Sequence, residues 1–187
     1  HLDGSLRLDS LIEMAAKAGV KLPSQTVEGL KQLVFKDSYQ NLGEYLHCFQ
    51  YTCAVLRDMD NLERAAYELA IDNQLEGVNY IEVRFAPQLL IDLPTGIDFD
   101  RVMHAVNNGL KRAQQEYNSH AAVLNGDKPP FAYGIINCAM RMFGDKGFSP
   151  YYTNLFQLMR DFSPIEVIKL AAMELVRASV CLLYTSP

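Results

Sequence analysis

Two short runs with strand periodicity, separated by a long helical pattern, place the strongest limit on what this chain can fold into. Residues 80–85, YIEVRF, alternate apolar and charged side chains as a strand does, and Pro87 ends the run. A second strand-like run, FAYGIINCAM, covers residues 131–140. An amphipathic helical pattern from Phe99 to Tyr117 lies between them. Strands separated by helical segments of this length favour a parallel sheet of βα units over a helix bundle.

Helical patterns, with apolar residues three and four positions apart, fill the chain before the first strand. The first helix is expected to begin with a capping box of Ser10 and Glu13. A single helix capped by Asn41 is expected to carry Leu42 to Cys53. The next helix is expected to begin at Asp60 with Glu63. Gly19 supplies the first stop. After the second strand, Ser163, Pro164 and Glu166 predict a final helix whose inward stripe includes Ile165, Ile168, Ala172, Leu175, Val176 and Ser179.

The count of strands indicates that this chain is part of a larger fold. A closed parallel barrel has eight strands and about 250 residues. The 187 residues here hold two complete strands, with the expected end of a third at His1 and Leu2. A sheet cut after so few strands leaves open edges, so we expect the chain alone not to fold stably.

Composition excludes several classes of protein. Hydrophobic residues make up 49% and charged residues 21%, as in ordinary globular proteins. The net charge of −5 argues against a nucleic-acid partner, and no apolar run approaches the roughly 20 residues that cross a membrane. The four cysteines, Cys48, Cys53, Cys138 and Cys181, form no CxxC pair and are too scattered for a disulfide framework. We infer a reducing compartment, the cytoplasm.

The sequence HLDG at residues 1–4 carries the sharpest chemical signal. A histidine at a strand end, followed by Asp3 and Gly4, suits a site at a barrel mouth, since imidazole binds metals and a carboxylate accepts hydrogen bonds. A frayed terminal turn would also explain these four residues. The other histidines, His47, His104 and His120, are expected at the surface.

Two further segments end strands and could reach the same rim. Glu82 and Arg84 would share one face of the first strand, where a structural ion pair explains them best. Gln88 and Leu89 would then lie on the functional rim. Met140 and Arg141 lie at the end of the second strand. Core packing explains Met140 and another ion pair explains Arg141 without a functional role, so neither residue establishes a site.

Taken together, these segments resemble the adenosine deaminase family of zinc-dependent amidohydrolases. The segments that carry the resemblance are HLDGSL at 1–6, LPSQTVEGL at 22–30, NLGEYLHCF at 41–49, GVNYIEVRFAPQLL at 77–90, GIINCAMR at 134–141 and FSPIEVIKLAAMELVRA at 162–178. The resemblance implies an α/β fold, a partial (β/α)₈ TIM barrel with about the first three βα units and extra helices after the first strand. Residues 1–180 would form the N-terminal part of that single domain. Residues 181–187, CLLYTSP, are expected to be foreign to the natural protein, with an ordinary strand start as the alternative.

The resemblance also implies the reaction and the residues that serve it. Zinc would lower the pKa of a bound water for hydrolytic deamination of adenosine and 2′-deoxyadenosine to inosine and 2′-deoxyinosine. His1 matches the second histidine of a zinc-binding His-x-His pair and would also touch the substrate, while Asp3 matches the aspartate that accepts a hydrogen bond from the ribose 5′-hydroxyl. The positions that match an apolar lid and the pocket lining are Tyr45, Leu46, Phe49, Leu89 and Met140.

Some of the implied machinery is missing, and alternatives stay open. The catalytic glutamate and histidine and the remaining zinc ligands would lie downstream, so we expect this chain alone to be inactive. Ala86 stands where the family often has serine. An adenine deaminase of the same superfamily is one alternative, although such relatives tend to carry glutamate at the position of Asp3. A family member that binds or signals without catalysis is another. A nucleotide substrate is disfavoured because the rim has no basic cluster for a phosphate.

Overall fold

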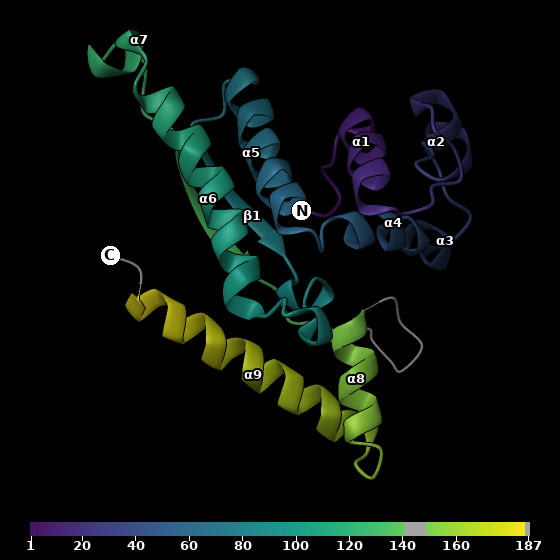
Figure 1. The fold of residues 1–187 in the computed structure, drawn as a ribbon. Helices are drawn as coiled ribbons and strands as arrows, with labels where there is room; N and C mark the ends of the chain where they lie inside the picture. Colours follow the sequence, from purple (N-terminus) through teal and green to yellow (C-terminus); the bar gives the residue numbers. More distant parts are fainter. Residues whose placement is uncertain (141–148, 186–187) are drawn as a thin grey trace.

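The computed structural model describes residues 1–140 and 149–185, with the backbone alone for residues 182–185. Arg141 falls outside the described residues. Figure 1 shows α5 and α6 running side by side near β1, with α1 to α4 gathered beyond α5 and the long α9 joined to α8. The elements in chain order are α1 (Leu8–Ala18), α2 (Val27–Leu33), α3 (Leu42–His47), α4 (Phe49–Val55), α5 (Met59–Leu75), β1 (Tyr80–Phe85), η1 (Pro87–Leu89), η2 (Leu93–Thr95), α6 (Phe99–Asn118), α7 (Ala121–Leu124), β2 (Ala132–Asn137), α8 (Pro150–Leu158) and α9 (Pro164–Thr185).

The two predicted strands form a parallel pair, which confirms the βα arrangement. Their register runs from Tyr80 opposite Ala132 to Phe85 opposite Asn137. The second strand is shorter than expected, because residues 131 and 138–140 lie outside it. The chain is therefore of mixed α/β class.

The first two residues lie beside β1 on the side away from β2. The Leu2 N–H donates to the Arg84 carbonyl oxygen at 3.0 Å, whereas the Phe85 carbonyl accepts from Cys138 of the other strand at 2.9 Å. Successive carbonyls of a parallel strand point to opposite neighbours, so Leu2 lies at a third strand position next to β1. Residues 1–2 carry no strand assignment, and the strand end expected there stays a prediction.

One face of the sheet is packed and the other is open. Val83 and Phe85 are buried in the main core with side chains from α5 and α6. Glu82 and Arg84 point the opposite way and are exposed, and among the described residues no ion pair joins them. The expected structural ion pair is wrong for this chain because both charges stay solvated on the uncovered face. Instead, Glu82 accepts a hydrogen bond from the Tyr80 hydroxyl at 3.2 Å.

Two helix starts differ from the sequence prediction. Helix α1 begins at Leu8 with Arg7 at the N-cap, and no side chain in the described part of the chain caps it. Ser10 lies inside the helix and is buried, so the capping box with Glu13 does not form. Arg7 is held by a hydrogen-bonded ion pair with Asp72 of α5, a long-range contact that favours the earlier start.

The start of α5 also precedes its predicted position. Asp58 caps this helix by accepting the Asn61 N–H at 2.9 Å, two residues before the expected Asp60. An aspartate at the N-cap satisfies one of the free amides of the first turn. Both aspartates contact Lys17, with Oδ–Nζ distances of 3.4 Å for Asp58 and 3.1 Å for Asp60.

Two predicted caps are confirmed. Asn41 accepts the Glu44 N–H at 2.9 Å. At α9, the Ser163 N–H donates to Glu166 Oε2 at 2.8 Å and the Glu166 N–H donates to Ser163 Oγ at 3.4 Å, which completes a capping box.

The helix expected after Asn41 is divided in two. The Cys48 N–H bonds to the Tyr45 carbonyl at 3.2 Å, three residues back rather than four. The Cys48 thiol also donates to the Val34 carbonyl at 3.1 Å. This tight turn ends α3, and α4 begins at Phe49.

Helix α9 buries a narrower stripe than its sequence suggests. Val167, Ala171 and Leu175 are buried, whereas Ile165 and Val176 are 64% and 62% exposed. The helix continues to Thr185 without a strand after residue 180, so the alternative of a strand start there is wrong for the described residues. None of the described helices combines the length and the apolar character that crossing a membrane requires.

Candidate functional site

The HLDG segment lies at the carboxyl end of β1, where the chain turns from the sheet into α1. Leu2 is buried and bonded to Arg84, which anchors the segment to the strand. Ser5 closes the turn, because its N–H donates to the Leu2 carbonyl at 3.2 Å and its Oγ donates to the His1 carbonyl at 2.6 Å. The turn therefore holds His1 and Asp3 beside the carboxyl end of β1 rather than leaving a frayed end.

Asp3 has a buried carboxylate oxygen without a donor. Its side chain is 13% exposed, and Oδ1 accepts no hydrogen bond from the described residues. The His1 Nδ1 lies 4.0 Å from this oxygen. Burial raises the pKa of Asp3, opposed by the N–H groups of Asp3 and Gly4. Buried polar atoms in folded proteins normally have a partner, so this oxygen is suited to receive a donor from a ligand.

Aromatic side chains from α3 and α4 approach the same turn. A Cβ placed on Gly4 would lie 3.5 Å from Cε1 of Phe49, so the Phe49 ring lies against the turn. The Tyr45 ring packs edge-on to Phe49 with a centroid distance of 5.4 Å and is 43% exposed. Leu46 is half-buried on the same helix as Tyr45. The structure thus brings Phe49 and Tyr45 to HLDG, and their lid role stays a prediction.

Leu89 reaches the site from η1. It lines a narrow pocket together with Asp3, and this pocket has no room for a water molecule. The full lining is Leu2, Asp3, Cys53, Leu56, Phe85, Ala86, Leu89 and Leu90. Met140 is not among these residues. It follows β2 and packs, half-buried, against the main core.

Cys53 and Arg57 belong to this region although the sequence analysis gave them no role in a site. Cys53 is fully buried beside Asp3, and its burial raises the pKa of the thiol to about 12, with the Asp3 charge acting in the same direction. The Arg57 guanidinium donates to the Leu89 carbonyl at 3.4 Å, and burial lowers the pKa of Arg57. The inward helical stripe marked Cys53 as core, and nothing in the local sequence distinguishes Arg57 from a surface arginine.

The donor set does not form a zinc site by itself. Among the described residues, no group of three or more His, Cys, Asp or Glu side chains is placed to hold a metal ion. A hydrolytic zinc site takes three protein ligands and a water. His1, with a side chain 57% exposed, offers one imidazole to such a set. The histidines expected at the surface, His47, His104 and His120, are indeed exposed.

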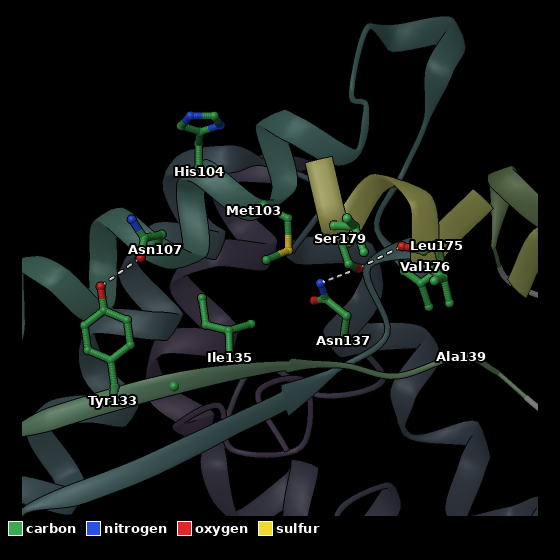
Figure 2. A pocket seen from close by; sticks show the side chains of 12 residues that line it. Met103, His104, Asn107, Tyr133, Ile135, Asn137, Ala139, Leu175, Val176 and Ser179 are labelled. Atoms are coloured by element: carbon green, nitrogen blue, oxygen red, sulfur yellow. Dashed lines mark hydrogen bonds between the residues drawn. The ribbon is translucent and has the colours of Figure 1, made fainter. Parts of the chain in front are cut away.

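A larger cavity of about 550 Å³ lies elsewhere, between α6, β2 and α9. Figure 2 shows Tyr133, Ile135 and Asn137 of β2 facing the two helices across it. The Tyr133 hydroxyl donates to Asn107 Oδ1 at 2.8 Å, and Asn137 Nδ2 donates to Ser179 Oγ at 2.9 Å. None of the predicted site residues lines this cavity. The candidate site is therefore the region around residues 1–4, beside the carboxyl end of β1.

Comparison with known proteins matches the sequence of this chain to a protein family. The sequence profile described as adenosine deaminase covers residues 1–180. The chain belongs to the adenosine deaminase family. The family match ends at the residue where the sequence analysis placed the boundary of the natural domain, and that boundary stays a prediction.

Three relatives named adenosine deaminase show how much of the family this chain represents. The Clostridium perfringens protein is 41% identical over 119 residues, which cover 63% of this chain and 35% of that protein. The Vibrio atlanticus protein is 36% identical over 118 residues, with the same coverage of 63% and 35%. The Clostridium botulinum protein is 31% identical over 184 residues, which cover 91% of this chain and 52% of that protein. The chain thus spans between about a third and about half of the length of these relatives.

Proposed function

We propose that the intact protein is a zinc-dependent adenosine deaminase that hydrolyses adenosine and 2′-deoxyadenosine to inosine and 2′-deoxyinosine. The family match and the names of the relatives support this proposal. The observation that carries it is the buried Oδ1 of Asp3, which has no donor among the described residues and lies at the rim beside His1.

In this proposal Asp3 binds the ribose. Its free oxygen accepts a hydrogen bond from the 5′-hydroxyl, and the buried setting strengthens that bond relative to one in water. Leu89 and Phe49 border the same turn and exclude water from the nucleoside. Leu46 and Tyr45 extend that apolar cover, and Met140 contributes to the lining from the segment after β2, outside the narrow pocket of Asp3. Because the contact is with the 5′-hydroxyl, loss of the 2′-hydroxyl has little effect on turnover.

The proposed fold is a (β/α)₈ barrel of which residues 1–180 form the N-terminal part. The hydrogen bond from Leu2 to Arg84 supports a strand position before β1. The exposed face that carries Glu82 and Arg84 then becomes the barrel interior. His1 is one proposed zinc ligand, and the other ligands and the catalytic glutamate and histidine lie outside this chain. The scattered free cysteines support a cytoplasmic protein.

The proposal is tested with the full-length protein supplied with zinc. We expect the ultraviolet absorbance change that accompanies conversion of adenosine to inosine. Replacing Asp3 with alanine should lower kcat/KM by about tenfold to a hundredfold, which corresponds to roughly 1–3 kcal/mol for one buried hydrogen bond. The zinc content should stay near that of the wild type.

Asp127→Ala is the matched control, because Asp127 is an exposed aspartate in the loop after α7. It should leave both turnover and zinc content unchanged. Turnover of adenine but not adenosine would instead identify an adenine deaminase. Absence of turnover with metal bound would identify a non-catalytic family member. Loss of zinc together with activity in Asp3→Ala would contradict the role given to Asp3.

A further inference from the structure

Gln88 has an unusual position for a polar side chain. It lies in η1, directly after β1, and is only 2% exposed. Its Nε2 donates to the Tyr151 hydroxyl at 3.0 Å and to the Ala171 carbonyl at 2.8 Å, and its Oε1 accepts from the Tyr152 hydroxyl at 2.8 Å. A buried amide is costly unless its hydrogen bonds are made. Here both ends of the amide are bonded.

The partners of Gln88 come from two distant helices. Tyr151 and Tyr152 belong to α8, Ala171 belongs to α9, and Ser149 Oγ adds a bond to the Gln88 carbonyl at 2.9 Å. The Tyr151 hydroxyl donates in turn to Glu174 of α9. Burial raises the pKa of both phenols, so both hydroxyls keep their protons and remain donors. These bonds join the segment after β1 to residues that lie 61 to 83 positions further along the chain.

The same segment is held from its other side. Arg57, in the turn between α4 and α5, donates to the Leu89 carbonyl at 3.4 Å. Leu89 follows Gln88 directly and lines the narrow pocket that contains Asp3. A shift of Gln88 therefore moves a wall of the candidate site relative to Asp3.

We propose that Gln88 is a positioning residue, which fixes Leu89 relative to Asp3 by joining η1 to α8 and α9. The inference rests on the proposed function, because it makes Leu89 a wall of the nucleoside pocket. Gln88 itself does not touch the substrate. Gln88 affects how closely the pocket fits the nucleoside, and it affects the ground state and the transition state equally.

The test replaces Gln88 with methionine in the full-length protein, which keeps the side-chain length and removes the hydrogen bonds. Looser fit of ground state and transition state alike raises KM and leaves kcat unchanged. We expect the KM for adenosine to rise about tenfold with kcat within about twofold of wild type. Amide hydrogen exchange in residues 87–91 should accelerate by about tenfold or more.

Gln74→Met is the matched control. Gln74 Nε2 also donates to a distant backbone carbonyl, that of Ala113 at 3.2 Å, but it joins α5 to α6 and does not line the pocket of Asp3. This variant should lower thermal stability without changing KM or the exchange of residues 87–91. If Gln88→Met fails to fold, Tyr152→Phe removes a single donor to Gln88 and should raise KM by about threefold.

The outcomes separate this inference from the proposed function. Unchanged exchange at residues 87–91, or faster exchange with an unchanged KM, would overturn the positioning role. An equal rise in KM in Gln74→Met would overturn it too, since the effect would then be general loss of stability. A wild-type protein that does not deaminate adenosine would refute the proposed function. Hydrogen exchange would still decide in that case whether Gln88 holds η1.

Discussion

Replacement of Gly109 by alanine should destabilise the protein, although alanine is the better helix former. Gly109 lies inside α6, where α6 crosses α5. A Cβ at this position would lie 2.2 Å from the Glu63 carbonyl oxygen and 2.9 Å from the Tyr67 nitrogen. Both are backbone atoms, so no side-chain rotation relieves the clash. Restoring an ordinary contact would require the helices to separate by about 1 Å.

The magnitude follows from two opposing terms. Helix propensity favours alanine over glycine by about 1 kcal/mol. Overpacking against fixed atoms costs about 3 kcal/mol at the upper end of its usual range. Separation of the helices also weakens the bond of Arg112 to Glu63 at 2.9 Å and its stacking 4.2 Å above the Tyr67 ring. We therefore expect a net loss of about 2 kcal/mol in the free energy of unfolding.

Urea unfolding of the full-length protein, followed by circular dichroism, measures this loss. Asn108→Ala is the control, because Asn108 is the exposed neighbour of Gly109 on the same helix. It tests helix propensity alone and should raise the free energy of unfolding by up to about 0.5 kcal/mol. If Gly109→Ala proves as stable as Asn108→Ala, the close approach of α5 and α6 is wrong.

Three further predictions address the α9 cap, the buried thiol and the catalytic competence of this chain. Ser163→Ala removes the capping box with Glu166 and should lower the free energy of unfolding of the full-length protein by about 1 kcal/mol, whereas equal stability would show that the cap contributes nothing. Burial raises the pKa of Cys53 to about 12, so iodoacetamide at pH 8 should label this thiol only after the protein unfolds. Peptide mass spectrometry measures the labelling, and labelling of the folded protein would contradict the burial of Cys53. The same shift makes stability fall as the pH rises from 9.0 towards 12, since the unfolded chain releases the thiol proton first. The 187-residue chain with stoichiometric zinc should not deaminate adenosine when assayed beside an active full-length control. The reason is that one imidazole, that of His1, cannot hold a hydrolytic zinc. Measurable turnover would refute the ligand assignment.

Local sequence determined part of the secondary structure, and the place of the candidate site stays a prediction. The alternation of YIEVRF fixed β1, and the Ser163–Glu166 and Asn41 caps fixed two helix starts, because these signals act between residues within four positions of each other. HLDG by itself was a weak signal, and the resemblance of the ordered segments gave its residues their proposed roles. The resemblance of ordered segments supplied the family, which the profile match confirms.

The tertiary structure alone decided which of these residues are buried, bonded or exposed. Arg7 starts α1 early through its pair with Asp72, 65 residues away. Glu82 and Arg84 stay exposed because the described chain leaves their face of the sheet uncovered. The free oxygen of Asp3 and the bonded amide of Gln88 have no local signature in the sequence. Burial and hydrogen bonding at such positions depend on segments brought together only when the chain folds, and short-range periodicity contains no information about them.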